Sequence, residues 1–172
     1  YVYACGPCNG PKNNRFAVLI EGETTHLEIT RKRGQPIEPP PPGEPAFLDP
    51  RVEDATKLMC LDLKETFRFV AIADKGSRDH TRVACTIDIL DLNRELMVAA
   101  RRDAFKDYSA HLSTYVTEKQ AGASPEELAE IQSTICSRQH PTVWREMQRQ
   151  RDKHPKLQQL FQKAPEAATW RK

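Results

Sequence analysis

The sequence lacks any apolar run approaching the roughly 20 residues that a helix needs to cross a bilayer. Its first residues also lack the basic and long apolar regions of a secretory signal. We therefore expect no membrane role and a cytoplasmic location. Hydrophobic residues make up 38% of the 172 residues and charged residues 29%, ordinary proportions for a globular protein. This length suits one main domain, or a small module joined to a helical one.

A disulfide framework is not expected either, because only two of the five cysteines, Cys5 and Cys8, are close in sequence. In a reducing compartment such a close pair is better explained by metal binding. The single cysteines Cys60, Cys85 and Cys136 have apolar neighbours and are expected to be buried thiols. We find no internal repeat.

Charge is unevenly distributed along the chain. Residues 138–172 hold nine Lys and Arg against three Asp and Glu, a balance of +6, and the rest holds 17 against 21, a balance of −4. A basic segment of this kind favours a polyanion as partner, although a helix surface rich in Arg and Lys can also be a solvated face.

The residue pattern predicts an α+β fold with a small antiparallel sheet and a predominantly helical C-terminal half. We expect short strands at 16–20 and 25–30, a Pro-rich loop at 35–45 and an antiparallel hairpin formed by 57–63 and 66–73. Apolar residues then recur in steps of three and four from residue 87 to residue 115, which predicts one face of a single long helix. Gly122 ends that helix, and Ser124-Pro125 begins the next. Further helices are expected at 143–153 and from 155 to 161.

The strongest local motif is Cys5-x-x-Cys8, which can present two thiolates to one zinc ion. Zinc needs two further ligands, and the chain has no second pair. The nearest histidine is His26, so we expect the missing ligands upstream of Tyr1. The alternative is that both cysteines are free thiols.

The first 12 residues, Tyr-Val-Tyr-Ala-Cys-Gly-Pro-Cys-Asn-Gly-Pro-Lys, resemble the last motif of HNH endonucleases without its leading Asn. The resemblance implies a ββα-metal site in which a first His activates water, a middle Asn holds the geometry and a final His or Asn binds the catalytic divalent cation. Asn9 takes that last role, and Lys12 matches the motif lysine. An amide oxygen suits Mg²⁺ or another hard cation. Asn9 could also be only the N-cap of a short helix.

A second block extends the resemblance to about residue 116. Residues 48–54, the hairpin and residues 86–101 resemble the region after the nuclease motif in HNH proteins encoded beside ATPases in antiphage systems of the Septu and retron type. This predicts residues 1–34 as the remnant of the nuclease motif with its zinc knuckle and short helix, 35–46 as a Pro-rich linker, and 47–172 as an α+β to helical region. The Pro-rich insertion departs from the family.

Basic side chains are the candidate nucleic-acid contacts. Arg94 and Arg101 fall on the apolar stripe, seven residues apart, where each must pair with a carboxylate or face phosphate. Asp49, Asp54 or Asp88 could supply the ion pair. Along the later basic helix, Arg145, Arg149 and Lys153 could follow a DNA backbone, or form an exposed face.

Our leading hypothesis is that the chain is part of a cytoplasmic HNH endonuclease that hydrolyses DNA phosphodiester bonds with one divalent ion and carries structural Zn²⁺. Because the chain lacks the His base and the middle Asn, we expect it to be inactive by itself. One alternative is a module that docks on a partner such as an ATPase through its helical half. Another is a nucleic-acid-binding protein without nuclease ancestry.

Overall fold

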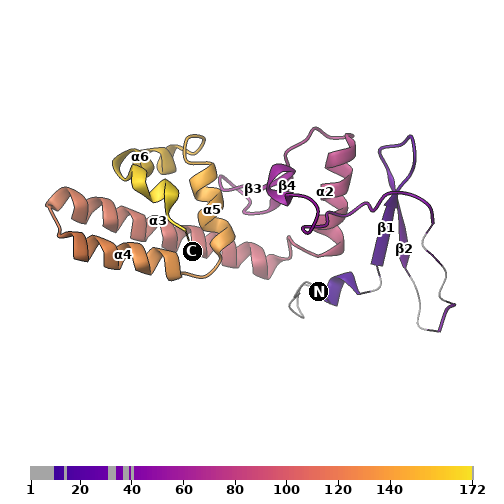
Figure 1. Cartoon of the computed structure of the whole chain (residues 1–172), viewed down its shortest axis with the longest axis horizontal. Coiled ribbons are helices and arrows are strands. Elements are labelled where there is room, and N and C mark those ends of the chain that lie inside the picture. The colour runs from indigo at the N-terminus through magenta and orange to yellow at the C-terminus, as the bar shows by residue number, and fades with distance from the viewer. Residues whose placement is uncertain (1–9, 14, 31–33, 37–38, 40, 172) are drawn as a thin grey trace. The chain divides into compact units, whose positions relative to one another are not determined.

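A computed structural model of the chain describes residues 10–13, 15–30, 34–36, 39 and 41–171 (Figure 1). The fold is α+β, as predicted, with helices and two small antiparallel sheets of two strands each. Two compact units divide the chain. The first unit comprises residues 1–60 and 68–94, and the second comprises 61–67 and 95–172. Among the described residues, no helix is both long and apolar enough to cross a membrane.

The first unit begins with the antiparallel strands β1 (Arg15–Leu19) and β2 (His26–Thr30), in register from Arg15 opposite Thr30 to Leu19 opposite His26. They confirm the two strands expected here. β1 carries the buried residues of the pair, whereas four of the five residues of β2 are exposed. On the other side of β1, the Ala46 N–H donates to the Ala17 carbonyl at 2.8 Å. The end of the Pro-rich stretch therefore packs against β1.

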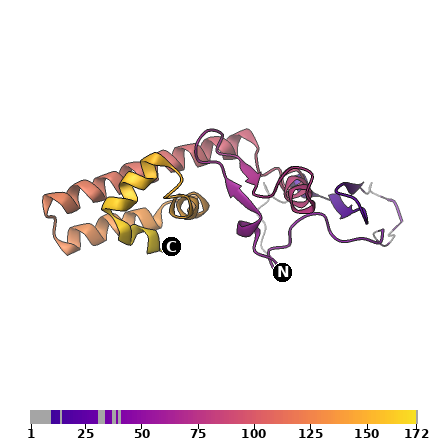
Figure 2. The same ribbon diagram turned by 90° about the horizontal axis from the view of Figure 1, so that it is seen from above.

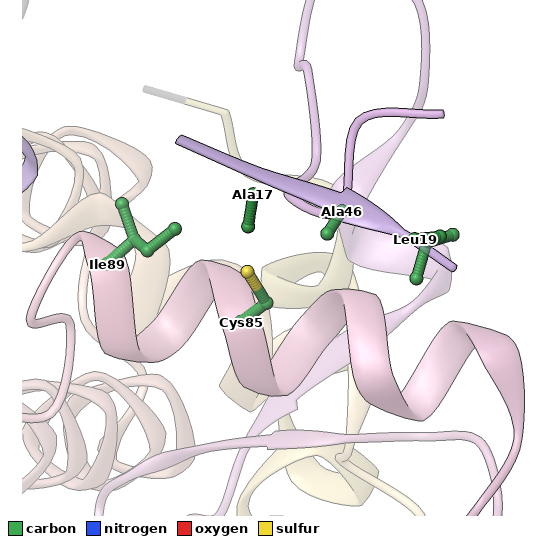
Figure 3. Packing of buried hydrophobic residues seen from close by; sticks show 5 residues of the cluster. All are labelled: Ala17, Leu19, Ala46, Cys85 and Ile89. Atoms are coloured by element: carbon green, nitrogen blue, oxygen red, sulfur yellow. The ribbon is translucent and has the colours of Figure 1, made fainter. Parts of the chain in front are cut away.

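Helix α2 (Arg78–Ile89) covers the inner side of β1. Figure 3 shows Cys85 and Ile89 on α2 facing Ala17 and Leu19 on β1, with Ala46 beside them. All five are less than 7% exposed. Burial raises the pKa of the Cys85 thiol to about 11, so it remains protonated and packs as a small apolar side chain.

Arg15 joins the two strands to α2 at the edge of this core. Its guanidinium binds both carboxylate oxygens of Glu28, at 2.7 and 2.9 Å, and also pairs with Asp88. The bidentate contact with Arg15 holds the pKa of Glu28 below its ordinary value. Asp88 is thus used within the first unit.

The predicted hairpin is present in shorter form, as β3 (Met59–Leu61) and β4 (Phe69–Ala71). A single 3₁₀ turn, η1 (Ala55–Lys57), precedes it and is capped by the Asp54 side chain. A second apolar cluster of Leu48, Met59 and Val83 lies on the other side of α2 from β1, with Phe69 and Ala71 packed against it.

The expectation of one long helix from residue 87 to 115 is wrong, because α2 ends at Ile89 and α3 (Glu95–Ala121) begins after a break. Asp91 takes a left-handed conformation at φ 47°, which Asp tolerates better than most residues. The Leu92 N–H then donates to the Ile87 carbonyl at 3.0 Å and closes the turn. Apolar spacing continues across the break, so periodicity alone cannot reveal it.

The second unit is helical: after α3 come α4 (Pro125–Ser137), α5 (Pro141–Arg149), α6 (Pro155–Lys163) and the 3₁₀ turn η2 (Pro165–Thr169). Each of these four begins with a proline, whose missing N–H costs nothing in a first turn. Ser124 and Glu127 form a reciprocal capping box at α4, which confirms the predicted helix start. Helices α3 and α4 pack side by side (Figure 2).

Within the first unit, Arg82 on α2 binds both carboxylate oxygens of Glu53, at 2.7 and 2.5 Å. Both side chains are largely buried, at 14% and 21% exposed. We expect Arg82→Ala to lower the free energy of unfolding by about 1 to 2 kcal/mol. The hydrogen bonds from Arg82 hold the pKa of Glu53 below its ordinary value of 4.5. Because this pKa is depressed in the folded state, the Arg82–Glu53 pair stabilises the folded state fully above pH 4.5. That stabilisation is lost as the pH falls through the folded pKa.

Chemical unfolding of the wild type and Arg82→Ala from pH 3 to 7 measures this linkage. The difference in the free energy of unfolding between the two proteins should become smaller below pH 4.5. Arg78 lies on the same helix as Arg82, is exposed and pairs with Glu44 in the Pro-rich stretch. Arg78→Ala is therefore the control and should stay within about 0.5 kcal/mol of the wild type. A constant difference across the pH range would show that Glu53 does not act through Arg82.

Candidate nucleic-acid interface

The predicted metal ligands Cys5, Cys8 and Asn9 lie outside the described residues. Within the described ranges, no group of three or more His, Cys, Asp or Glu side chains is placed to hold a metal ion. Of the other cysteines, which are free thiols, Cys85 is buried as expected, while Cys60 and Cys136 are only partly buried. The described part of the chain therefore does not by itself form a metal cage.

Lys12 is the one residue of the predicted motif that the structure places. Residues 10–12 are helical, which agrees with the short helix expected directly after the knuckle. The Lys12 ammonium nitrogen lies 5.8 Å from the centroid of the Phe47 ring, within the range of a cation–π contact. Phe47 in turn packs edge-on against Phe16. The helical turn that carries Lys12 is thereby attached to the first unit.

Arg94 and Arg101 have different surroundings. Arg94 is partly buried in the turn after α2, whereas Arg101 is only 6% exposed on α3. Both make interactions within the protein. Of their candidate partners, Asp49 binds Arg51 and Asp88 binds Arg15. Deep burial of Arg101 favours a structural role over a phosphate contact, since a guanidinium must reach the surface to bind a backbone phosphate.

Helix α5 separates its apolar and basic residues. Val143, Trp144 and Met147 are buried, while Arg145 and Arg149 are exposed. Arg149 donates to Glu146 at 2.7 Å. The side chains of Arg145 and of the exposed Lys153, which follows the helix, have no ion-pair or hydrogen-bond partner among the described residues. Arg145 and Lys153 are therefore the free cations among the three predicted for this helix.

A groove of about 480 Å³ runs along one side of α5. One wall comes from the helix, and the other comes from η2 and the two residues after it. The side chains that matter for binding are Arg145 and Arg171, both exposed and without a partner in the described part of the chain. Trp144 and Trp170 form the apolar floor, with 3% and 6% of their surfaces exposed.

Hydrogen bonds fix the wall after η2. The Gln148 amide donates to the carbonyls of Ala167 and Trp170, both at 2.9 Å. Glu166 in η2 accepts from Tyr115 at 2.8 Å and from Lys119 at 2.7 Å, both on α3. Burial would raise the pKa of Glu166, but these hydrogen bonds outweigh it and the pKa lies below its ordinary value. Burial and the Glu166 contact raise the pKa of Tyr115 to about 12. Arg171 is therefore carried by a well-anchored segment.

Sequence reasoning found Arg145 but not Arg171, Trp170 or Gln148. These residues come together only because η2 folds back on α5. No local pattern reports that contact. The one available signal is that the two tryptophans of the chain lie within its basic segment.

A second polar cluster joins α3 to the turn before α5. Asp107 pairs with Arg138 at 3.2 Å, and Arg138 also contacts His111 Nε2. His111 Nδ1 lies 2.9 Å from the Asp107 carbonyl, so the neutral tautomer protonated at Nδ1 satisfies both contacts. The Tyr108 hydroxyl donates to the Gln139 carbonyl at 2.8 Å. The polar groups of this cluster thus bind one another and hold the turn before α5 in place.

Comparison of the chain with protein-family models, with curated proteins and with solved structures finds no match.

Proposed function

We propose that this chain is part of a cytoplasmic HNH endonuclease of antiphage defence that hydrolyses DNA phosphodiester bonds with a divalent cation. The observation that carries the proposal is the segment Cys5-x-x-Cys8-Asn9-x-x-Lys12, whose last residues are helical as the motif requires. In this proposal Cys5 and Cys8 bind structural Zn²⁺ and Asn9 binds Mg²⁺ or a similar cation. When bound, that cation would stabilise charge on the phosphate and on the leaving oxygen.

The second unit contributes DNA affinity in this proposal. Arg145 and Arg171 flank the groove on α5, and Lys153 extends the basic surface beyond the helix. Backbone phosphates need only positive charge at suitable spacing, so this surface suits binding without sequence preference. Arg149 can join it, although its contact with Glu146 reduces its free charge.

A DNA-binding module without catalysis is the second candidate, since the same free cations would serve it. The two proposals differ in what residues 5–12 do. Docking on an ATPase is a further possibility for the whole protein, and co-purification would test it.

Removal of both groove arginines should weaken DNA binding. We expect Arg145→Ala/Arg171→Ala to reduce affinity for a 20-base-pair duplex by about tenfold at 0.1 M salt, and to lower the slope of log K against log salt by about 2. Fluorescence anisotropy across a salt series measures both. Lys64→Ala/Lys106→Ala removes the same charge from exposed positions outside the groove and is the matched control. This interface would be contradicted if both double variants lost the same affinity for DNA, or if the affinity of the wild type did not depend on salt concentration.

Nuclease activity is not expected from the 172-residue chain alone, because its sequence holds neither the His base nor the middle Asn of the motif. Incubation of the purified chain with supercoiled plasmid and Mg²⁺ or Mn²⁺ should leave the plasmid intact. Cleavage that requires metal and disappears in Asn9→Ala would refute the expected inactivity. DNA binding is measured separately, so the proposed DNA affinity of the second unit and the proposed nuclease motif are tested independently.

A further inference from the structure

The β3–β4 hairpin leaves one edge of β4 partly open. The Ile72 N–H donates to the Leu58 carbonyl at 2.9 Å, so residues 70 and 72 direct their backbone groups toward β3. Backbone groups alternate along a strand, so residues 69 and 71 direct theirs to the opposite edge. At this opposite edge, no strand pairs with β4 among the described residues.

Asn93 occupies the beginning of that edge. Its side-chain oxygen accepts from the Phe69 N–H at 2.8 Å, and its side-chain nitrogen donates to the Phe69 carbonyl at 3.0 Å. This pair of bonds is the one that a residue of a neighbouring strand would make. The Asn93 side chain therefore makes the two hydrogen bonds that one residue of an adjacent strand would make with Phe69. Two residues further, the Ala71 N–H and carbonyl point to the same edge, where no strand pairs with β4 among the described residues.

A groove of about 590 Å³ lies beside this open edge. β4 forms one side of it and α2 forms the other. Ala84 and Ile87 of α2 line it, and the fully buried Val83 lies beneath them. A free strand edge next to a helix is the arrangement in which peptides add as an extra strand: the edge binds the peptide backbone, and the helix side selects its side chains.

Charge differs between the two ends of the groove. Near the end of β4, Lys75 is exposed and has no partner among the described residues, and His80 lies beside it in the lining. At the other end, Asp91 is exposed, and Asp88 shares the single positive charge of Arg15 with Glu28. An acidic side chain fits the Lys75 end and a basic one fits the Asp91 end.

We propose that this groove binds an extended peptide segment of a partner protein, which adds to β4 as a third strand. Its backbone exchanges two hydrogen bonds with Ala71. Its inward side chain is small and apolar and contacts Ala84 and Ile87, and an acidic residue of the segment pairs with Lys75. The site shares no residue with the proposed knuckle or with the lining of the groove on α5, so it stands whether or not the chain is part of a nuclease.

Ala71→Pro is the sharpest variant for testing this site. Proline removes an N–H that faces outward, which an edge strand tolerates, and leaves the bonds to β3 in place. Circular dichroism and the melting temperature should stay close to the wild type. Val70→Pro, which removes an N–H directed toward β3, is the contrasting variant and should lower the melting temperature.

The probe is a phage-displayed library of random seven-residue peptides, selected on the immobilised 172-residue chain. We expect proline-free sequences that alternate small apolar residues with polar ones and carry an acidic residue at one end. Synthetic copies should bind Ala71→Pro at least tenfold more weakly than the wild type. Lys75→Glu should also weaken binding of these peptides. A peptide with lysine in place of its acidic residue should recover binding to that variant.

Two further measurements keep the proposal open to refutation even if Ala71→Pro misfolds. N-methylation of the peptide amide facing the Ala71 carbonyl should weaken binding tenfold, and the peptide should slow hydrogen exchange of the Ala71 amide. Selected peptides that bind wild type and Ala71→Pro equally, or no enrichment at all, would overturn the proposal. Concentration-dependent dimers in the wild type that vanish in Ala71→Pro would also overturn it, because a second copy would then occupy the edge.

Discussion

Replacement of Trp144 by alanine is expected to bring the second unit close to unfolding at 25 °C. Trp144 is 3% exposed and stacks on Tyr108, with ring centroids 5.3 Å apart. Phe161 and Trp170 lie on its other sides, at 5.9 and 6.2 Å. Truncation of such a side chain costs about 3 to 5 kcal/mol, and each aromatic pair adds about 0.5 to 1.5 kcal/mol. The stability of a whole domain is about 5 to 15 kcal/mol, so the loss is a large part of it.

Tryptophan fluorescence reports this loss directly, because Trp144 and Trp170 are the only tryptophans of the chain. In Trp144→Ala the remaining emission of Trp170 should shift to the red at a lower urea concentration than in the wild type. Trp144→Phe retains a ring in the cluster and should lose about 1 to 2 kcal/mol. A melting temperature within about 2 °C of the wild type in Trp144→Ala would show that the cluster does not hold this unit together.

The same cluster forms the floor of the proposed DNA groove. Trp144 also donates from its indole nitrogen to the Trp170 carbonyl at 3.4 Å, which Gln148 reaches at 2.9 Å. The carbonyl just before Arg171 is therefore held from two sides. DNA binding should survive in Trp144→Phe and fail in Trp144→Ala, because Arg171 keeps its place only while the cluster is packed.

Local chemistry predicted those features of the fold that depend on a few neighbouring residues. Ser124 and Pro125 mark the start of α4 because a hydroxyl caps free amides and proline suits a first turn. Gly122 ends α3 at φ 85°, which glycine adopts without strain. β-branched and alternating residues predicted β1 and β2 for a similar reason, since alternate residues of a strand share one face.

Features made by distant residues were not predictable in the same way. The break between α2 and α3 preserves the apolar spacing, so only the left-handed Asp91 reveals it. Asn93 substitutes for a strand residue through contacts with Phe69, 24 positions earlier. Arg82 was not singled out because its partner Glu53 lies on a different segment. The knuckle residues Cys5, Cys8 and Asn9 stay a prediction, since they lie outside the described residues.

Glu146 illustrates the limit of reading a basic segment from its composition. In the net charge of residues 138–172, Glu146 counts as one of three acidic residues against nine basic ones. The structure, however, places it in the interior, where it is 6% exposed. Its carboxylate accepts from the Gln150 side chain at 2.7 Å and from the Leu61 N–H at 3.4 Å. Gln150 also donates to the Leu61 carbonyl at 2.7 Å. Glu146 and Gln150 together thus hold both backbone groups of Leu61 against α5.

Glu146→Ala should consequently destabilise the second unit by about 2 to 4 kcal/mol, because it leaves buried donors without their charged acceptor. Glu146→Gln keeps the shape and one acceptor oxygen, so its free energy of unfolding should fall by about half as much as that of Glu146→Ala. Glu130→Ala, at an exposed position on α4, is the control and should stay within about 0.5 kcal/mol of the wild type. Urea unfolding followed by tryptophan fluorescence measures all three. If Glu146→Ala unfolds like Glu130→Ala, the attachment of Leu61 to α5 depends on apolar packing alone.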